Sequence, residues 1–297
     1  MQHRRSAAGR AGLALGLLLA GAAQAAPGPD RSDVAYGPDP RQKLDLCRPA
    51  GGDPGGAAIA VVMIHGGGWN GGRKEDYRGM CRLFADRGGF VVAAIEYRFA
   101  DGSAQGAWPA FMEDAQLALR WMRVHARDYG ADPGRICALG DSAGGHIAAL
   151  LAATRMVIPG DMAGELPGVS PAVACAVDEF GPADFTVASP FQNALARFFP
   201  GLDEAGRRAR AREVSPLFAI GPDTAPVFVT HGFDDKAAPI GQSFALVAAL
   251  QRAGVRAEFM AFDGGHEFVG QSPAAKAALL ELEMDFVRRT GGLGPSR

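Results

Sequence analysis

The sequence has no clear excess of charge of either sign and no hydrophobic run long enough to cross a membrane. Its 297 residues include 30 lysines and arginines and 32 aspartates and glutamates, so the formal net charge is −2. Nucleic-acid affinity comes largely from basic side chains that neutralise phosphates, so this balance argues against a nucleic-acid partner. The longest apolar run, residues 11–22, is shorter than the roughly 20 residues of a membrane-spanning helix, so no stable membrane insertion is expected.

Cysteine is scarce, and its spacing argues against a metal centre. The four cysteines, Cys47, Cys81, Cys137 and Cys175, form no C-x-x-C pair and no Cys/His cluster of the kind that binds zinc. We therefore expect no metal and no organic cofactor. Cys137 and Cys175 lie in apolar runs typical of buried strands, where we expect free thiols that pack as small hydrophobic groups. If a disulfide forms, the expected pair is Cys47 with Cys81.

The first 25 residues have the layout of a signal peptide. Arg4, Arg5 and Arg10 give a basic start before the apolar run. Residues 23–25, Ala-Gln-Ala, then supply the small-x-small pattern of a cleavage site. We expect residues 1–25 to be removed and the protein to be exported, to the periplasm or beyond the cell. Their removal takes away three arginines and no acid, so the net charge of −2 becomes −5.

Residues 26–297 are predicted to form one α/β domain, because short apolar runs alternate with helical periodicity and no internal repeat is present. The predicted strands are 59–64, 90–95, 134–140, 173–177, 227–230 and 257–262. The predicted helices are 77–88, 109–129, 143–153 and 272–289. Such alternation predicts a mostly parallel central sheet with helices on both faces, whose chemistry lies at the carboxyl ends of the strands.

Three segments fall outside this alternation. Residues 27–40 are rich in Pro, Gly and Asp and are predicted to form an extended arm, and residues 44–47 alternate as an edge strand would. Residues 178–224 lie between the fourth and fifth predicted strands and are interpreted as a small cap or lid. Their arginine-rich part, 203–213, is interpreted as a solvated helix face with acidic partners, in preference to a basic binding patch.

Residues 140–144, Gly-Asp-Ser-Ala-Gly, match G-x-S-x-G between a predicted strand and a predicted helix. A nucleophile elbow requires this context, because a sharp turn holds the serine hydroxyl clear of the sheet at a helix N-terminus. Small residues must flank the serine where the backbone folds on itself. The alternative is an ordinary helix start with Ser142 near the N-cap. The strand-turn-helix context favours Ser142 as a nucleophile.

Residues 65–69, His-Gly-Gly-Gly-Trp, directly follow the first predicted parallel strand. Consecutive glycines let the backbone approach a ligand with its N–H groups exposed, and fixed N–H donors stabilise the oxyanion that acyl transfer builds. A flexible glycine loop is the alternative, but it does not explain the flanking His and Trp. The expected oxyanion donors are the N–H groups of Gly67, Gly68 and Ala143.

A serine nucleophile needs a base and an acid that orients the base. His266 lies on a glycine-flanked loop after the last predicted strand, where this topology requires its general base. His146 lies in the helix after the elbow, and His231 ends a strand as a structural turn residue would. The acid is expected between the serine and His266, and Asp234 and Asp235 both qualify by position.

With these motifs the sequence resembles the bacterial esterases of the α/β-hydrolase superfamily, in particular the feruloyl-esterase-associated or carbohydrate-ester hydrolases. It is more distantly similar to hormone-sensitive-lipase-like esterases. The resemblance extends from Tyr36 to Val287 and implies the α/β-hydrolase fold and a serine esterase. The segments that carry it are 65–69, 96–98, 108–110, 140–146 and 231–239.

The resemblance also favours one of the two aspartates as the acid. The family has an H-G-x-x-D-x-x-V-P stretch, which maps its acid onto Asp235; Ala238 replaces the Val, so Asp234 remains the alternative. Where lipase-like members read Tyr-Arg-Leu-Ala-Pro-Glu, this chain has Tyr-Arg-Phe-Ala-Asp at 97–101. The missing Glu favours the carbohydrate-esterase-like group.

The expected function is therefore serine-dependent hydrolysis of short-acyl or carbohydrate-linked esters through an acyl-enzyme. In this hypothesis Ser142 attacks the carbonyl, His266 transfers the proton and Asp235 orients His266. A formamidase or another amide hydrolase with the same three residues is the first alternative, because fold does not decide substrate. A binding protein that kept the fold without catalysis is the second alternative.

Overall fold

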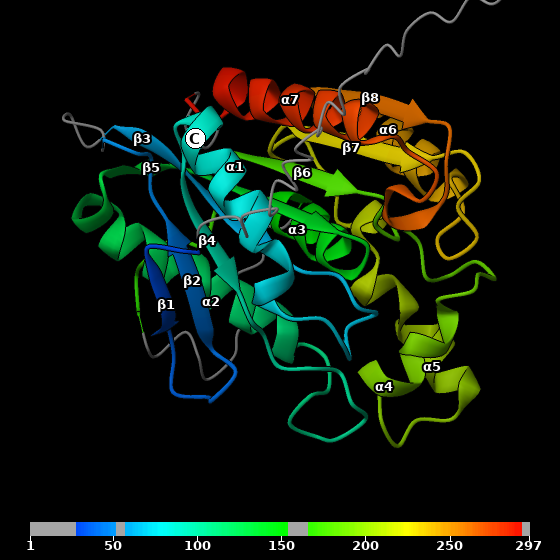
Figure 1. The fold of residues 1–297 in the computed structure, drawn as a ribbon. Helices are drawn as coiled ribbons and strands as arrows, with labels where there is room; N and C mark the ends of the chain where they lie inside the picture. Colours follow the sequence, from blue (N-terminus) through cyan, green and yellow to red (C-terminus); the bar gives the residue numbers. More distant parts are fainter. Residues whose placement is uncertain (1–27, 52–56, 154–165, 293–297) are drawn as a thin grey trace, which may run out of the picture.

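The computed structural model describes residues 28–51, 57–153 and 166–292, so the expected signal peptide lies outside the described residues. The described strands form an eight-stranded sheet in the order β1-β2-β4-β3-β5-β6-β7-β8. Helices α1 and α7 cover one face, and α2, α3 and α6 cover the other (Figure 1). This architecture confirms the expected α/β-hydrolase fold.

The six strands predicted from the sequence are all present and parallel to one another. The eight strands are β1 Arg31–Ala35, β2 Lys43–Cys47, β3 Ala58–Ile64, β4 Val91–Ile95, β5 Ala131–Asp141, β6 Cys175–Glu179, β7 Val227–Gly232 and β8 Ala257–Phe262. Parallel strands need both faces covered, and every residue of β3, β4, β6 and β7 is buried accordingly.

The expected edge strand is not at the edge. Strand β2 pairs antiparallel with β4 on one side and with β1 on the other, so β1 forms the border of the sheet. Strand β1 lies within the stretch that was expected to be an extended arm. It is mostly exposed, and a polar strand with one solvated face carries no apolar pattern that would reveal it.

The long helices match their predicted positions, with one omission. They are α1 Arg78–Gly88, α2 Ala110–His125, α3 Ala143–Ala153, α6 Gly241–Arg252 and α7 Pro273–Thr290. Helix α7 begins where the side chain of Ser272 accepts a hydrogen bond from the N–H of Ala275. Helix α6 was not predicted, because two of its four buried positions are the polar residues Gln242 and Ser243.

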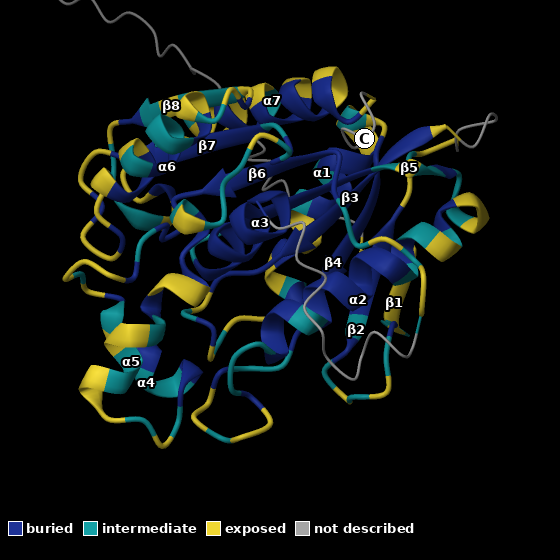
Figure 2. Ribbon diagram, turned by 180° about the vertical axis from the view of Figure 1, so that it is seen from behind, coloured by how far each residue is buried: buried dark blue, intermediate teal, exposed yellow. Residues whose placement is uncertain are grey.

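Side chains of the parallel strands alternate between two cores. In β3, Ala60, Val62 and Ile64 pack toward α2 and α3, whereas Ile59, Val61 and Met63 pack toward α1 and α7. Helix α3 is buried along its whole length, because the sheet covers one side and the insertion after β6 covers another (Figure 2). The turn at Ser142 therefore connects β5 to a helix that is buried on every side.

Two disulfides join the described cysteines, and no free cysteine remains among them. The predicted bridge between Cys47 of β2 and Cys81 of α1 is confirmed. The prediction of free thiols at Cys137 and Cys175 was wrong, because these residues form the second bridge. Strands β5 and β6 pair in a register that places them opposite each other, with Cα atoms 4.7 Å apart. Sequence spacing does not show that register.

The segment between β6 and β7 begins later than expected, because Asp178 and Glu179 belong to β6. The rest contains the short helices α4 Leu195–Phe198 and α5 Glu204–Arg210 and the 3-10 helices η4 Gln192–Ala194, η5 Ala211–Val214 and η6 Pro216–Phe218. We call residues 180–226 the insertion. Helix α5 buries none of its residues, and two of its arginines, Arg208 and Arg210, pair with Glu204 and Glu213, which confirms the solvated helix face.

Candidate active site

Ser142 stands on a strained turn between β5 and α3. Its φ is +52°, a left-handed conformation that is rare for a residue with a side chain. A Cβ atom at Gly144 would lie 1.8 Å from the carbonyl oxygen of Ile64, so only glycine fits where the turn meets β3. The N–H of Ser142 donates to the carbonyl of Glu179 at 2.8 Å, which ties the turn to β6. The local sequence thus forces the serine into an elbow.

Three loops bring Ser142, His266 and Asp235 into one chain of hydrogen bonds. His266 lies in η7, His266–Phe268, after β8, and its Nε2 is 2.8 Å from Ser142 Oγ. Its Nδ1 is 2.6 Å from Oδ2 of Asp235, which follows β7. The alternative acid, Asp234, is exposed, and its N–H donates to the carbonyl of Gly264 instead. The structure therefore places Asp235 beside the imidazole.

The surroundings of Asp235 keep its carboxyl group charged. Burial raises its pKa, but hydrogen bonds from His231, His266 and the N–H of Ala238 together outweigh burial and lower the pKa below the ordinary value. Oδ1 accepts from the N–H groups of Ala237 at 2.8 Å and Ala238 at 2.9 Å. A carboxylate held in this way can stabilise a neighbouring imidazolium.

His231 has a part in the site that the sequence did not reveal. It is fully buried, and its Nε2 lies 2.7 Å from the carbonyl of Ala238 and 3.2 Å from Asp235 Oδ2. A proton on Nε2 can serve both acceptors, so Nδ1 accepts from the hydroxyl of Ser243 at 2.6 Å. The interpretation as a turn residue was therefore incomplete. The signal available in the sequence was that His231 lies four residues before Asp235.

The glycine loop after β3 packs directly onto the elbow. The N–H of Gly66 donates to Asp141 Oδ1 at 2.8 Å, and Tyr77 hydrogen bonds to the same oxygen. Gly67 has φ of +107° and Gly68 of +62°, which turns the chain sharply beside the serine. Among the hydrogen bonds of the described residues, none uses the N–H of Gly67 or Gly68 as donor. These two groups are available to an oxyanion.

The third expected donor, the N–H of Ala143, lies at the start of a helix. Ala143 is the first residue of α3, and the first N–H groups of a helix have no partner within the helix. The partial positive charge of a helix N-terminus also favours a negative oxygen at this position.

The insertion holds the glycine loop from the opposite side. Trp69, which is 3% exposed, donates from Nε1 to Nδ1 of His146 at 3.0 Å, and His146 Nε2 donates to the carbonyl of Val214 in η5 at 2.7 Å. Burial lowers the pKa of His146 to about 4, so this imidazole is neutral. Arg197 of α4 donates from Nη2 to the carbonyl of Gly68 at 2.9 Å. Sequence patterns gave no sign of these contacts.

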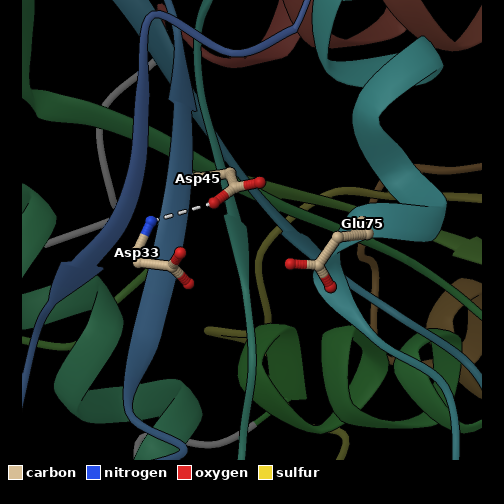
Figure 3. Close-up of side chains that lie close together, drawn as sticks. All are labelled: Asp33, Asp45 and Glu75. Carbon is tan, nitrogen blue, oxygen red and sulfur yellow. Dashed lines mark hydrogen bonds between the residues drawn. The ribbon is translucent and has the colours of Figure 1, made fainter.

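One cluster of three carboxylates, away from the serine, has the spacing of a cation site within the described residues (Figure 3). Its members are Asp33, Asp45 and Glu75. The ammonium of Lys74 lies between them, with Nζ at 3.0, 2.8 and 2.6 Å from their oxygens. Lys74 is 2% exposed, and these hydrogen bonds outweigh burial and raise its pKa. The carboxylates therefore serve as partners of this buried lysine.

The parallel sheet, the elbow after β5 and the histidine loop after β8 define an α/β hydrolase. The chain belongs to the BD-FAE family, whose model matches residues 44–250. Among the described residues, no helix has both the length and the hydrophobicity to span a bilayer.

Known esterases are similar to this chain in sequence and structure. Esterase LipQ of Mycobacterium tuberculosis is 34% identical over 247 residues, which are 77% of this chain and 56% of LipQ. The butyrate-bound esterase Est2 of Thermogutta terrifontis has a TM-score of 0.73 at 28% identity and covers 89% of this chain and 95% of its own. A bifunctional GH43-CE protein of Bacteroides eggerthii has a TM-score of 0.77 at 27% identity, over 88% of this chain and 35% of its own. The chain spans little more than half of the length of the curated relatives LipQ and LipM.

Proposed function

We propose that this protein is a serine hydrolase of carboxylic esters that works through an acyl-enzyme. The observation that carries the proposal is the hydrogen-bonded order Ser142, His266, Asp235, with contacts of 2.8 and 2.6 Å. A hydroxyl that donates to a neutral imidazole, itself held by a charged carboxylate, is an activated nucleophile.

In the proposed reaction, Ser142 Oγ attacks the ester carbonyl carbon while its proton passes to Nε2 of His266. The carbonyl oxygen becomes an oxyanion, which accepts hydrogen bonds from the N–H groups of Gly67, Gly68 and Ala143. When the tetrahedral intermediate breaks down, His266 returns the proton to the leaving alcohol. A water molecule then attacks the acyl-enzyme by the same route and releases the acid.

The proposed substrates are esters of short acyl groups or of carbohydrates. Support comes from relatives named esterases and from the similarity to an esterase solved with bound butyrate, a four-carbon acid. We propose in addition that residues 26–297 form one hydrolase domain and that the insertion acts as its cap. The contacts of Arg197 and Val214 with the glycine loop and His146 support this role.

Hydrolysis of p-nitrophenyl acetate and butyrate by the wild type and by Ser142→Ala tests the proposal. We expect turnover by the wild type and a loss on the order of 10⁶ in kcat in the variant. An N-formyl amide assayed in parallel separates an esterase from a formamidase. Equal turnover of the esters by both proteins would overturn the assignment of Ser142, and no turnover by the wild type would favour a binding protein.

We also propose that the protein is exported. The signal-peptide pattern of residues 1–25 supports this, as do the two disulfides, because disulfides persist mainly in oxidising compartments. Cell fractionation followed by N-terminal sequencing tests the proposal. A cytoplasmic protein that retains residues 1–25 would contradict it.

A further inference from the structure

The glycine loop continues into a tight turn, residues 67–70, whose last residue is Asn70. The backbone N–H of Asn70 donates to the carbonyl of Gly67 at 3.2 Å, and both central residues, Gly68 and Trp69, have φ of +62°. Two successive residues in the left-handed region are typical of a type I′ turn. This conformation is strained at Trp69, which has a side chain, and such strain persists where surrounding contacts hold the backbone.

The side chain of Asn70 makes contacts of this kind. Its amide nitrogen faces the loop and donates to the carbonyl oxygens of both Gly67 and Gly68, each at 3.2 Å. The opposite orientation of the amide would place its oxygen against two carbonyl oxygens, where no group can donate. The Gly68 carbonyl also accepts from Nη2 of Arg197 at 2.9 Å. Asn70 itself is exposed to solvent.

A carbonyl that is held in place also fixes the N–H group of the next residue. The peptide bond is planar and trans, so the C=O of Gly67 and the N–H of Gly68 point in opposite directions. With the Gly67 oxygen turned toward Asn70, the Gly68 N–H points away from Asn70, and no hydrogen bond among the described residues uses it as a donor. The amide of Asn70 therefore orients the N–H that the proposed mechanism gives to the oxyanion.

The preceding peptide of the loop is held in the same manner. Nδ1 of the buried His65 lies 2.7 Å from the carbonyl oxygen of Gly66. That oxygen can only accept, so Nδ1 carries the proton, and the N–H of Gly67 points to the other side of the peptide. Each of the two glycine donors thus has one side chain behind it, His65 for Gly67 and Asn70 for Gly68.

We propose that Asn70 is a positioning residue, whose amide holds the peptide between Gly67 and Gly68 so that the Gly68 N–H faces the oxyanion before substrate arrives. The inference rests on the proposed ester hydrolysis. Donors that are already oriented need no rearrangement when negative charge develops, so their orientation contributes to kcat more than to binding of the ground state. Asn70 acts through Gly68 and contributes no group to the reacting atoms.

Asn70→Ala removes the amide and keeps the backbone N–H that closes the turn. We expect kcat for p-nitrophenyl butyrate to fall about tenfold with KM within about twofold, because direct loss of an oxyanion donor costs about 10²–10³ and a misdirected donor retains part of its effect. Asn193→Ala, the same change at an exposed site in η4, is the matched control and should keep wild-type kinetics. Wild-type kinetics in Asn70→Ala, or a higher KM at constant kcat, would overturn the inference.

A pair of ketones separates the oxyanion from the rest of the site. Trifluoromethyl pentyl ketone adds the serine hydroxyl and forms an oxyanion, whereas methyl pentyl ketone has the same chain and adds it poorly. In Asn70→Ala we expect the inhibition constant of the first to rise about tenfold, as kcat falls, and that of the second to stay unchanged. Inhibition constants that rise together would show a general distortion of the site and contradict a positioning role.

The wild type distinguishes failure of this inference from failure of the proposed function. If the wild type hydrolyses the ester through Ser142 and Asn70→Ala does so equally fast, the inference alone is wrong. A wild type that hydrolyses no ester and binds both ketones equally would refute the proposed function, and the role of Asn70 with it.

Discussion

Two neighbouring aspartates show how different the surroundings of adjacent residues can be. Asp235 is buried and hydrogen bonds to His266 and His231, whereas Asp234 is exposed to solvent. Residues that follow each other in a turn point in different directions, so their position in the sequence did not separate them. Of the two, Asp235 contacts His266, and the lowered pKa of its carboxyl group keeps that group charged at neutral pH.

Asp235→Asn is expected to lower kcat by about 10⁴, because an amide can hold the imidazole in the wrong tautomer and does not stabilise its cation. Steady-state kinetics on p-nitrophenyl butyrate measures the effect. The adjacent Asp234→Asn is a matched control and should stay within a few-fold of the wild type. A larger loss in Asp234→Asn than in Asp235→Asn would reverse the assignment of the two residues.

At the scale of elements, the glycine loop is held between the elbow and the insertion. Gly66 is fixed to Asp141 on one side, and the carbonyl of Gly68 accepts from Arg197 of α4 on the other. Arg197 is partly buried, and its Nε has no hydrogen-bond partner in the described part of the chain, while Nη2 makes the contact with the loop. The insertion therefore contacts the loop that carries two of the proposed oxyanion donors, Gly67 and Gly68.

Arg197→Met is expected to lower kcat by about tenfold with little change in KM. Direct loss of an oxyanion donor typically costs about 10²–10³ in kcat, and a residue that acts through Gly68 should cost less. Arg208→Met on the exposed α5, whose side chain pairs with Glu204, is the control and should have wild-type kinetics. A rise in KM at constant kcat would show that Arg197 contacts substrate instead.

Elements with a strong apolar pattern were predicted well, and those with a polar pattern were not. The ends of the parallel strands and of α3 were located within three residues, because most of the residues in these elements are apolar. Strand β1 and helix α6 were missed. One is largely solvated, and the other buries polar side chains that hydrogen bond to the insertion and to His231. Their stability comes from partners elsewhere in the chain, which local patterns do not record.

At the scale of the whole molecule, two buried carboxyl groups lie where the sheet packs against its last helix. Glu179 of β6 and Glu283 of α7 are both fully buried, and neither oxygen of Glu283 has a hydrogen-bond partner within the described residues. Burial raises the pKa of Glu283 from 4.5 to about 8, although Glu179 and Lys276 act in the opposite direction. The pair therefore retains a proton in the folded protein at neutral pH.

Stability is expected to fall as the pH rises from about 4.5 toward 8. In this window the folded protein binds a proton at Glu283 that the unfolded chain has released, so raising the pH favours unfolding by up to about 1.4 kcal/mol per pH unit. Glu283→Gln removes the titrating group and donates a hydrogen bond to Glu179, so the fall should become shallower. Urea unfolding at several pH values measures it.

Glu281→Gln on the same helix is the control for this experiment, because Glu281 pairs with Arg87 at the surface. Its stability should follow the wild type across the whole range. A Glu283→Gln variant whose free energy of unfolding falls as steeply as that of the wild type would show that the carboxyl pair is not the source of the pH dependence.

The sequence by itself determined the fold class, the elbow at Ser142, the glycine loop and the histidine that faces the serine. These features follow from local requirements: apolar residues where a strand is covered on both sides, and glycine where backbone atoms meet. Only the tertiary structure decided the contact of Asp235 with His266, the Cys137–Cys175 bridge and the contact of Arg197 with Gly68. Each depends on which residues far apart in the chain become neighbours in space, such as Gly68 and Arg197 at a separation of 129 residues, and the register of strands and the packing of loops set those neighbours.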